Sequence, residues 1–163
     1  MHWLIDGNNL LHLIPEILWT TPGQGQGQAL ALACLIKPYR SAKKLKITLF
    51  FDGGENQASA SLSGMPCVFS GPEKSADQVM LEFMQKQPAN ALVLVSNDSA
   101  LCAAAESMGA RCVSAGVFAG RLRHSQGMED EAGEGWNFST RKKGPSRRLP
   151  KNKRQQNKLL NKL

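Results

Sequence analysis

The sequence predicts an α/β domain in which a largely parallel sheet is covered by helices on both faces. Its apolar segments are short and continuous rather than alternating with polar residues, as in strands buried on both sides. Segments with helical spacing of apolar residues lie between them. The 163 residues are 42% hydrophobic, enough for one sizeable core.

The first half of this domain begins with an apolar strand at residues 2–5. A Gly-Asn-Asn turn leads into a helix expected at 10–19, and glycine and glutamine then make residues 22–28 a loop. A second helix is expected at 29–39, where Pro38 ends or kinks it.

A β-rich segment at 45–51 predicts the second strand, and small polar residues at 53–64 predict a loop. A short third strand is expected at 67–69. Ser75 and Gln78 then have the spacing of a capping box ahead of a helix at 79–86.

The clearest buried strand is at residues 91–95. The helix after it runs to Met108 and stops at Gly109, a residue suited to a left-handed helix end. A last strand at 111–114 and a short helical turn near 117–122 complete the domain.

Charge divides the chain unevenly. Of the 20 Lys and Arg residues, ten follow Ser139, where there is no acid, so residues 1–138 hold ten basic residues against 13 acids. We expect a folded domain at 1–123, an acidic linker at 124–138, and a basic, disordered tail at 139–163.

The four cysteines form no C-x-x-C pair. We expect neither a zinc site nor a disulfide, and interpret them as small core residues of a reducing compartment. No apolar run is long enough to span a membrane. The first strand begins too early for a signal peptide, so we expect a soluble cytoplasmic protein.

Four aspartates stand where strands end or helices begin: Asp6, Asp52, Asp77 and Asp98. A parallel sheet gathers the carboxyl ends of its strands at one edge, so these acids can meet. Carboxylates without basic partners repel one another, but together they suit a hard divalent cation. The alternative is that each is an ordinary turn or cap residue.

Ordered sequence blocks carry a resemblance to a known family. They are Ile-Asp6-Gly-Asn-Asn-Leu, Phe-Phe-Asp52-Gly, Ser-Ala-Asp77 and Val-Ser-Asn-Asp98, followed by Ala-Glu-Ser-Met-Gly-Ala. Over residues 1–123 the chain resembles the NYN branch of the PIN-like ribonucleases, and within it the YacP-like group. The resemblance implies a three-layer fold whose sheet has the strand order 3-2-1-4-5.

The resemblance also implies a catalytic site. Asp6, Asp77 and Asp98 would be catalytic, and with Asp52 they would bind Mg²⁺ or Mn²⁺, which activates water and neutralises phosphate charge. Two departures from the family pattern concern the ligands: Asn97 separates Ser96 from Asp98, and the Glu often found among the acids could be Glu55 or Glu82. Asp52 is the least secure ligand, because it could support a loop instead.

The remaining candidates are expected to contact RNA. They are Asn8, Asn9, Ser96, Arg121, Arg123, Arg141, Lys142 and Lys143, although Asn9 could simply cap the first helix. The basic tail attracts polyphosphate without reading its sequence. The YacP-like group is associated with ribosomes and messenger RNA cleavage, which points to messenger or ribosomal RNA as substrate and the ribosome as a partner.

The sequence therefore predicts a metal-dependent endoribonuclease. A non-catalytic RNA-binding or ribosome-associated module on the same fold is the first alternative. A PIN-type toxin nuclease and a structure-specific DNA nuclease are two others, and the long basic tail argues against the toxin.

Overall fold

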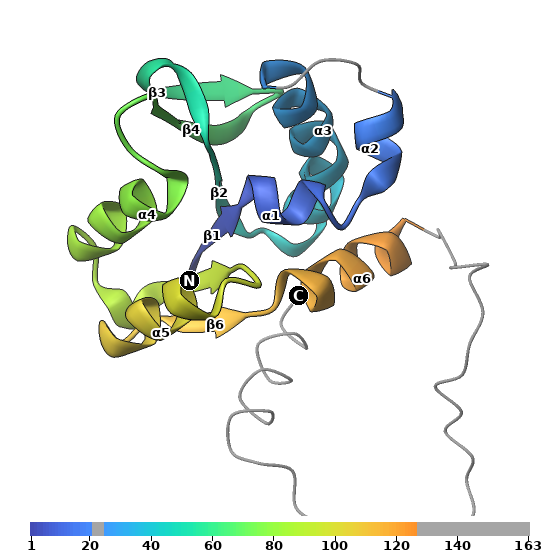
Figure 1. Cartoon of the computed structure of the whole chain (residues 1–163). Coiled ribbons are helices and arrows are strands. Elements are labelled where there is room, and N and C mark those ends of the chain that lie inside the picture. Colours follow the sequence, from blue (N-terminus) through green and yellow to red (C-terminus); the bar gives the residue numbers. More distant parts are fainter. Residues whose placement is uncertain (21–24, 127–163) are drawn as a thin grey trace, which may run out of the picture.

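A six-stranded sheet forms the middle of the protein in the computed structural model, which describes residues 1–20 and 25–126 (Figure 1). Its order is β3-β4-β2-β1-β5-β6, and all neighbours are parallel except β3 and β4. The strands are β1 (His2–Asp6), β2 (Lys46–Phe51), β3 (Gly53–Leu62), β4 (Met65–Gly71), β5 (Leu92–Val95) and β6 (Arg111–Val113). The five strands predicted from the sequence take the predicted order, and β3 is added at one edge.

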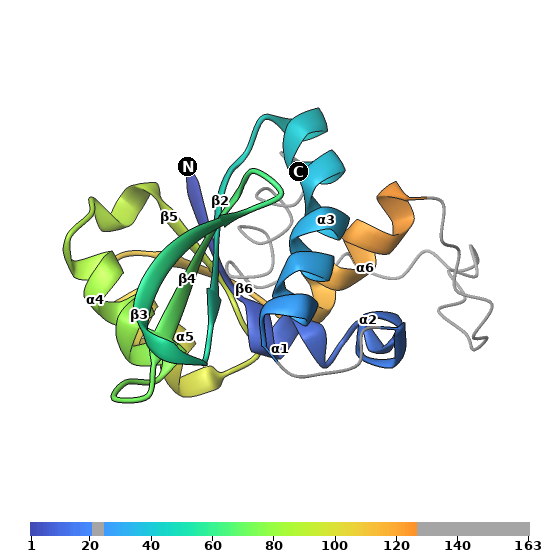
Figure 2. The ribbon, with the colours of Figure 1, turned by 90° about the horizontal axis from the view of Figure 1, so that it is seen from above.

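Helices cover both faces of this sheet, as predicted (Figure 2). One face carries α1 (Gly7–Leu11), α2 (Pro15–Thr20), α3 (Gln26–Lys43) and α6 (Ala115–Ser125). The other carries α4 (Ala76–Gln85) and α5 (Ser99–Ser107). The result is the three-layer arrangement typical of doubly wound α/β domains.

The central strands are apolar on both sides because each side faces its own core. In β1, Trp3 and Ile5 pack with α3 and α6, whereas Leu4 faces the opposite core beneath α4 and α5. All three are at most 2% exposed. This explains why the sequence shows continuous apolar runs rather than alternation.

The loop expected at 53–64 is wrong, because the structure forms β3 there, antiparallel to β4. Nearly every residue of β3 is exposed, so this edge strand has no buried face and no apolar pattern. Ser63 and Gly64, both with positive φ, make the tight turn into β4. A Ser-Gly turn is a weaker sequence signal than Asn-Gly.

The single helix expected at 10–19 is also wrong. Two short helices form instead, α1 beginning at Gly7 and α2 at Pro15. Proline has no N–H to donate and is well suited to a first helical position. Pro38, in contrast, lies inside α3, which continues to Lys43.

Two predicted helix boundaries are confirmed. Ser75 Oγ accepts from the N–H of Gln78 at 3.2 Å, while the Gln78 side chain accepts from the N–H of Ser75 at 3.1 Å, which closes the capping box of α4. Gly109 has φ +91° just after α5. The short turn expected near 117–122 is part of the longer helix α6.

The expectation of four unpaired core cysteines is wrong as well. Cys102 of α5 and Cys112 of β6 form a disulfide, Cys34 is exposed, and Cys67 is a buried thiol. The pairing follows from α5 packing beside β6, a tertiary contact that the cysteine spacing does not show.

Among the described residues, no helix is long and apolar enough to cross a membrane. The basic tail predicted at 139–163, with Arg141, Lys142 and Lys143, lies outside the described residues, as does most of the acidic linker predicted at 124–138.

Candidate functional site

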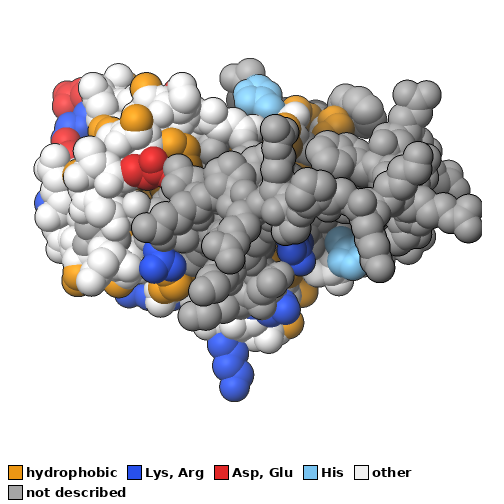
Figure 3. Space-filling view, turned by 90° about the horizontal axis from the view of Figure 1, so that it is seen from below, with side chains coloured by type: hydrophobic (Ala, Val, Ile, Leu, Met, Phe, Trp, Pro, Cys, Tyr) orange, Lys and Arg blue, Asp and Glu red, His pale blue; other side chains and the backbone are white. Residues whose placement is uncertain are grey.

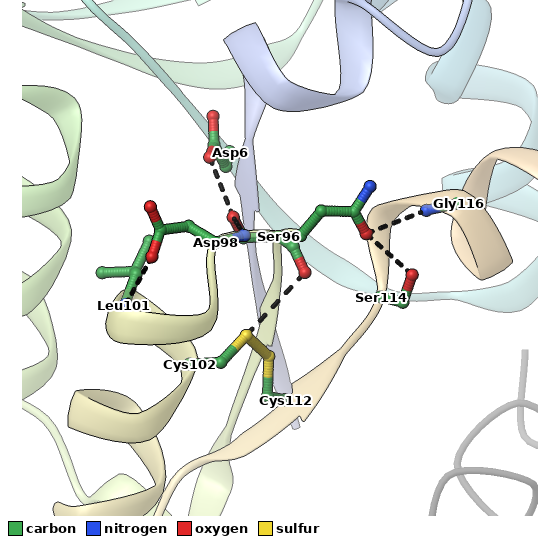
Figure 4. Close-up of a disulfide and its surroundings, with 9 residues drawn as sticks. Asp6, Ser96, Asp98, Leu101, Cys102, Cys112, Ser114 and Gly116 are labelled. Carbon is green, nitrogen blue, oxygen red and sulfur yellow. Dashed lines mark hydrogen bonds between the residues drawn. A yellow bond between two sulfur atoms is a disulfide. The ribbon is translucent and has the colours of Figure 1, made fainter.

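The carboxyl ends of β1 and β5 meet where the crossover direction of the sheet reverses, the usual place for a ligand crevice. Asp6 is the last residue of β1 and is only 6% exposed. Ser96 follows β5 and is buried. Its hydroxyl donates to Asp6 Oδ2 at 3.0 Å, so a hydrogen bond joins the two strand ends (Figure 4).

Asp98 is attached to the same serine. The backbone N–H of Asp98 donates to Ser96 Oγ at 3.1 Å. Asp98 Oδ1 accepts from the N–H of Leu101 at 2.8 Å and so caps α5. Within the described part of the chain, the second carboxylate oxygen of Asp98 makes no hydrogen bond, which leaves it available to a ligand.

Asn97, the residue that departs from the family pattern, contacts a different element. Its Oδ1 accepts from Ser114 Oγ at 2.7 Å and from the N–H of Gly116 at 3.5 Å. It therefore ties the loop after β5 to the start of α6. Asp98 is the acid of this loop that caps α5.

Asp52 uses both carboxylate oxygens to hold the surrounding helices. Oδ1 accepts from the N–H of Ala76, the first residue of α4, at 2.7 Å. Oδ2 accepts from Asn8 Nδ2 of α1 at 3.0 Å. Asp52 therefore fixes the start of α4 next to Asp77, whose carboxylate makes no hydrogen bond in the described part of the chain.

The four acids act on one another electrostatically. Burial raises the pKa of Asp6; the Asn9 N–H and the Ser96 hydroxyl oppose this, while the charges of Asp52 and Asp98 add to it. Burial is also the largest cause of the raised pKa of Asp77, followed by the charges of Asp6, Asp98 and Asp52. Across residues 1–20 and 25–126 none of the four forms an ion pair.

Other predicted site residues lie elsewhere or do other work. Asn9 does not cap α1: its N–H donates to Asp6 Oδ1 at 3.0 Å, so Asp6 is the cap. Glu82 pairs with Lys74 at 2.5 Å, and Glu55 is exposed on β3. In α6, Arg121 is exposed, while Arg123 donates to the backbone carbonyl of Leu13.

The donors in this site fit a hard divalent cation in chemistry. All are carboxylate oxygens, and Mg²⁺ commonly takes one or two of these and keeps several waters. Among the described residues, no three His, Cys, Asp or Glu side chains stand close enough to enclose a metal by themselves. Asp77 and the second oxygen of Asp98 are the donors not already used in hydrogen bonds.

Burial of Asp77, together with the neighbouring acids, predicts an unusual pH dependence for Asp77→Asn. Because the pKa of Asp77 is raised by folding, the native state holds its proton more strongly than the unfolded state. The stability of the parent therefore falls as pH rises through that pKa. Between pH 4 and 7 we expect the free energy of unfolding of the variant to rise by about 0.5 kcal/mol relative to that of the parent. Calorimetry should show this as a shift of about 1–3 °C in melting temperature.

A matched control is Glu106→Gln, an exposed acid two turns further along α5 from Asp98. It should show little of this change with pH. Asp77 also sits in the first turn of α4, where a helix favours negative charge. If the parent instead becomes more stable relative to Asp77→Asn as pH rises, the helix end outweighs both burial and the neighbouring acids, and a raised pKa of Asp77 is refuted.

Comparison with known proteins gives two findings. A family model described as the YacP-like NYN domain matches residues 3–162. Two structures of Rae1 (YacP) from Bacillus subtilis, one a point mutant, each superpose with a TM-score of 0.63 at 17% identity. The match covers 77% of this chain and 76% or 75% of theirs, and at this identity it shows a shared fold. No protein with a curated description matches the sequence.

Proposed function

The chain belongs to the YacP-like NYN domain family, and from this premise we propose that it is a divalent-metal-dependent endoribonuclease. NYN and PIN-like proteins are typically ribonucleases with a nuclease-type fold. The observation that carries the proposal is the group of four aspartates, which lack basic partners in the described part of the chain. Burial first, and then the charges of the other acids, raise the pKa of Asp6 and of Asp77. Structural aspartates have little reason to be gathered in this way.

The aspartates take unequal parts in this proposal. Asp77 and Asp98 would bind Mg²⁺ or Mn²⁺ through their unused oxygens, together with Asp6. Asp52 and Ser96 would act as positioning residues, because their hydrogen bonds hold the start of α4 and the loop after β5. That Asp52 also binds the cation, as a secondary ligand, stays a prediction. A bound cation would supply an activated water and neutralise charge on the phosphate.

RNA binding would draw on charge outside this group of acids. Where described side chains are visible in Figure 3, Lys and Arg appear at scattered points rather than as one continuous stripe. The ten basic residues after Ser139, with no acid among them, are the candidate we propose for attracting the RNA backbone. Messenger or ribosomal RNA exposed on the ribosome is the substrate class we propose.

Cleavage by the full chain tests the proposal. Incubation with ribosomes and total RNA should produce new RNA ends in Mg²⁺ or Mn²⁺, and chelator should remove them. The reason is that the cation is the group proposed to activate the water and to neutralise charge on the phosphate. Sequencing of RNA ends gives the readout, and ends that are unchanged by chelator would refute metal dependence.

A non-catalytic RNA-binding module is the second candidate, favoured by the lack of a preformed group of three metal ligands among the described residues. Titration of the full chain with Mn²⁺ by calorimetry separates the two. Heat of binding that is lost in Asp98→Asn supports the nuclease. A silent titration together with retained RNA binding supports the module.

A further inference from the structure

A cavity of about 570 Å³ opens beside the acids, and the proposed function does not use it. Asn8 and Asp52 form part of its wall. The same two residues are hydrogen-bonded to each other, and Asp52 also holds the start of α4. The cavity and the acid site therefore share the side chains of Asn8 and Asp52. Neighbouring nucleotides of one RNA strand would be able to occupy both.

The cavity has an apolar floor. Leu11 and Phe51 line it and are 7% and 3% exposed, and half-buried Leu18 of α2 adds to the apolar lining. The Phe51 ring is already stacked on Phe69, with centroids 5.5 Å apart. This ring therefore contributes to the floor but is not a free platform for stacking.

Two polar side chains that line the same cavity make no hydrogen bond to the described residues. Gln28, in the first turn of α3, is half-buried, and its amide makes no hydrogen bond within the described part of the chain. His12 ends α1, is exposed, and its ring has no hydrogen bond among the described residues. An amide and a free aromatic ring beside an apolar floor are the groups that bind a flat heterocycle with polar edges.

We propose that this cavity binds one nucleobase of the RNA, that of a nucleotide next to the phosphate held at the acids. His12 stacks on the base and Gln28 hydrogen-bonds its edge. The inference rests on the proposed function for the identity of the ligand. It assigns base selection to His12 at the end of α1 and Gln28 of α3, rather than to the acids.

The volume agrees with such a ligand. Pockets for small ligands usually measure about 300–1,000 Å³, with mostly apolar walls and a few polar groups that set orientation. Single-stranded RNA is recognised through bases that are turned out, stacked on aromatic rings and hydrogen-bonded at their edges. Stacking accepts every base, so any preference would come from Gln28.

The test compares the full chain with the variants His12→Ala and Gln28→Ala. Neither side chain makes a hydrogen bond to the described residues or belongs to the core, so both variants should fold. His124→Ala, an exposed histidine near the end of α6, is the matched control. Binding of short single-stranded RNA is measured by fluorescence anisotropy in chelator. Raised salt is used so that the contribution of the basic tail is suppressed.

We expect His12→Ala to weaken binding by about 5- to 150-fold, the value of one stacked base. Gln28→Ala should weaken it by about 2- to 10-fold, and by different factors for different homopolymers. His124→Ala should bind like the parent. When Mg²⁺ or Mn²⁺ is present, the base frequencies next to the cut sites should change in Gln28→Ala and not in the control.

The outcomes separate this inference from the proposed function. Binding that depends on His12 in a chain that does not cut supports the cavity and refutes the nuclease. Cutting with unchanged binding and unchanged base frequencies in both variants supports the nuclease and overturns the cavity. Binding of free mononucleotides that depends on His12, without binding of RNA, also overturns it, because the cavity would then serve a free nucleotide.

Discussion

Asp98→Asn is expected to lower RNA cleavage by at least about 100-fold while leaving the fold intact, a rise of about 2.7 kcal/mol in the barrier. Asparagine caps helices as well as aspartate does, and its Oδ1 can accept from the N–H of Leu101 as the carboxylate does. What is lost is the negative charge and the unused oxygen proposed to bind the cation. Cleavage assays on the purified full-length variant, with circular dichroism as a check on folding, give the measurement.

Asp6→Asn should have the same effect on cleavage and a larger effect on structure. Asp6 accepts hydrogen bonds at both oxygens, from the N–H of Asn9 and from the Ser96 hydroxyl. An asparagine can accept at only one of these, so Ser96 must turn its hydroxyl proton elsewhere. Glu106→Gln should cut at the parent rate, and full activity in either aspartate variant would remove the metal site from the proposal.

The sequence predicts the parallel part of the sheet because strands buried on both faces are apolar at nearly every position. β1 and β5 read as unbroken apolar runs. The order of the strands, in contrast, comes from the resemblance to the NYN family. The sequence does not predict β3, for the opposite reason. An edge strand paired through its backbone alone has no apolar face to show.

The candidate site is predictable only at the level of position. The carboxyl ends of parallel strands meet at one edge, and this brings Asp6, Asp52 and Asp98 together without any knowledge of packing. Which oxygens remain unused depends on partners distant in sequence. Asp52 is bonded to the N–H of Ala76, 24 residues away, and its assignment as a metal ligand stays a prediction.

The cavity beside the acids lies beyond this kind of reasoning. Its lining comes from α1, α2, α3 and the end of β2, and the sequence suggests one helix where Pro15 separates two. His12 is therefore expected in the first turn of a longer helix, although it stands at the C-terminal end of α1. Only the packing of three helices brings it into the same cavity as Gln28.

Gly7→Ala is expected to destabilise the protein by about 1–3 kcal/mol, although alanine normally favours a helix over glycine by about 1 kcal/mol. A Cβ at Gly7 would lie 2.2 Å from Phe51 Cε1 and 2.6 Å from Cδ1. The Phe51 ring is 3% exposed and stacked on Phe69, so moving it away from the added Cβ disturbs that stacking. Differential scanning calorimetry should show a fall of about 3–10 °C in melting temperature.

The effect of Gly7→Ala should reach the site, because Gly7 lies between Asp6 and Asn8 and any shift of α1 moves both. Gly120→Ala is the matched control: it is exposed on α6, nothing lies within 4 Å of its added Cβ, and it should gain about 0.5–1 kcal/mol. Adding Phe51→Leu to Gly7→Ala should make the two losses less than additive, because the smaller side chain relieves the clash. Strict additivity would show that Gly7 and the ring are not in tight contact. In that case, packing against Phe51 would not explain why a glycine stands at position 7, between Asp6 and Asn8.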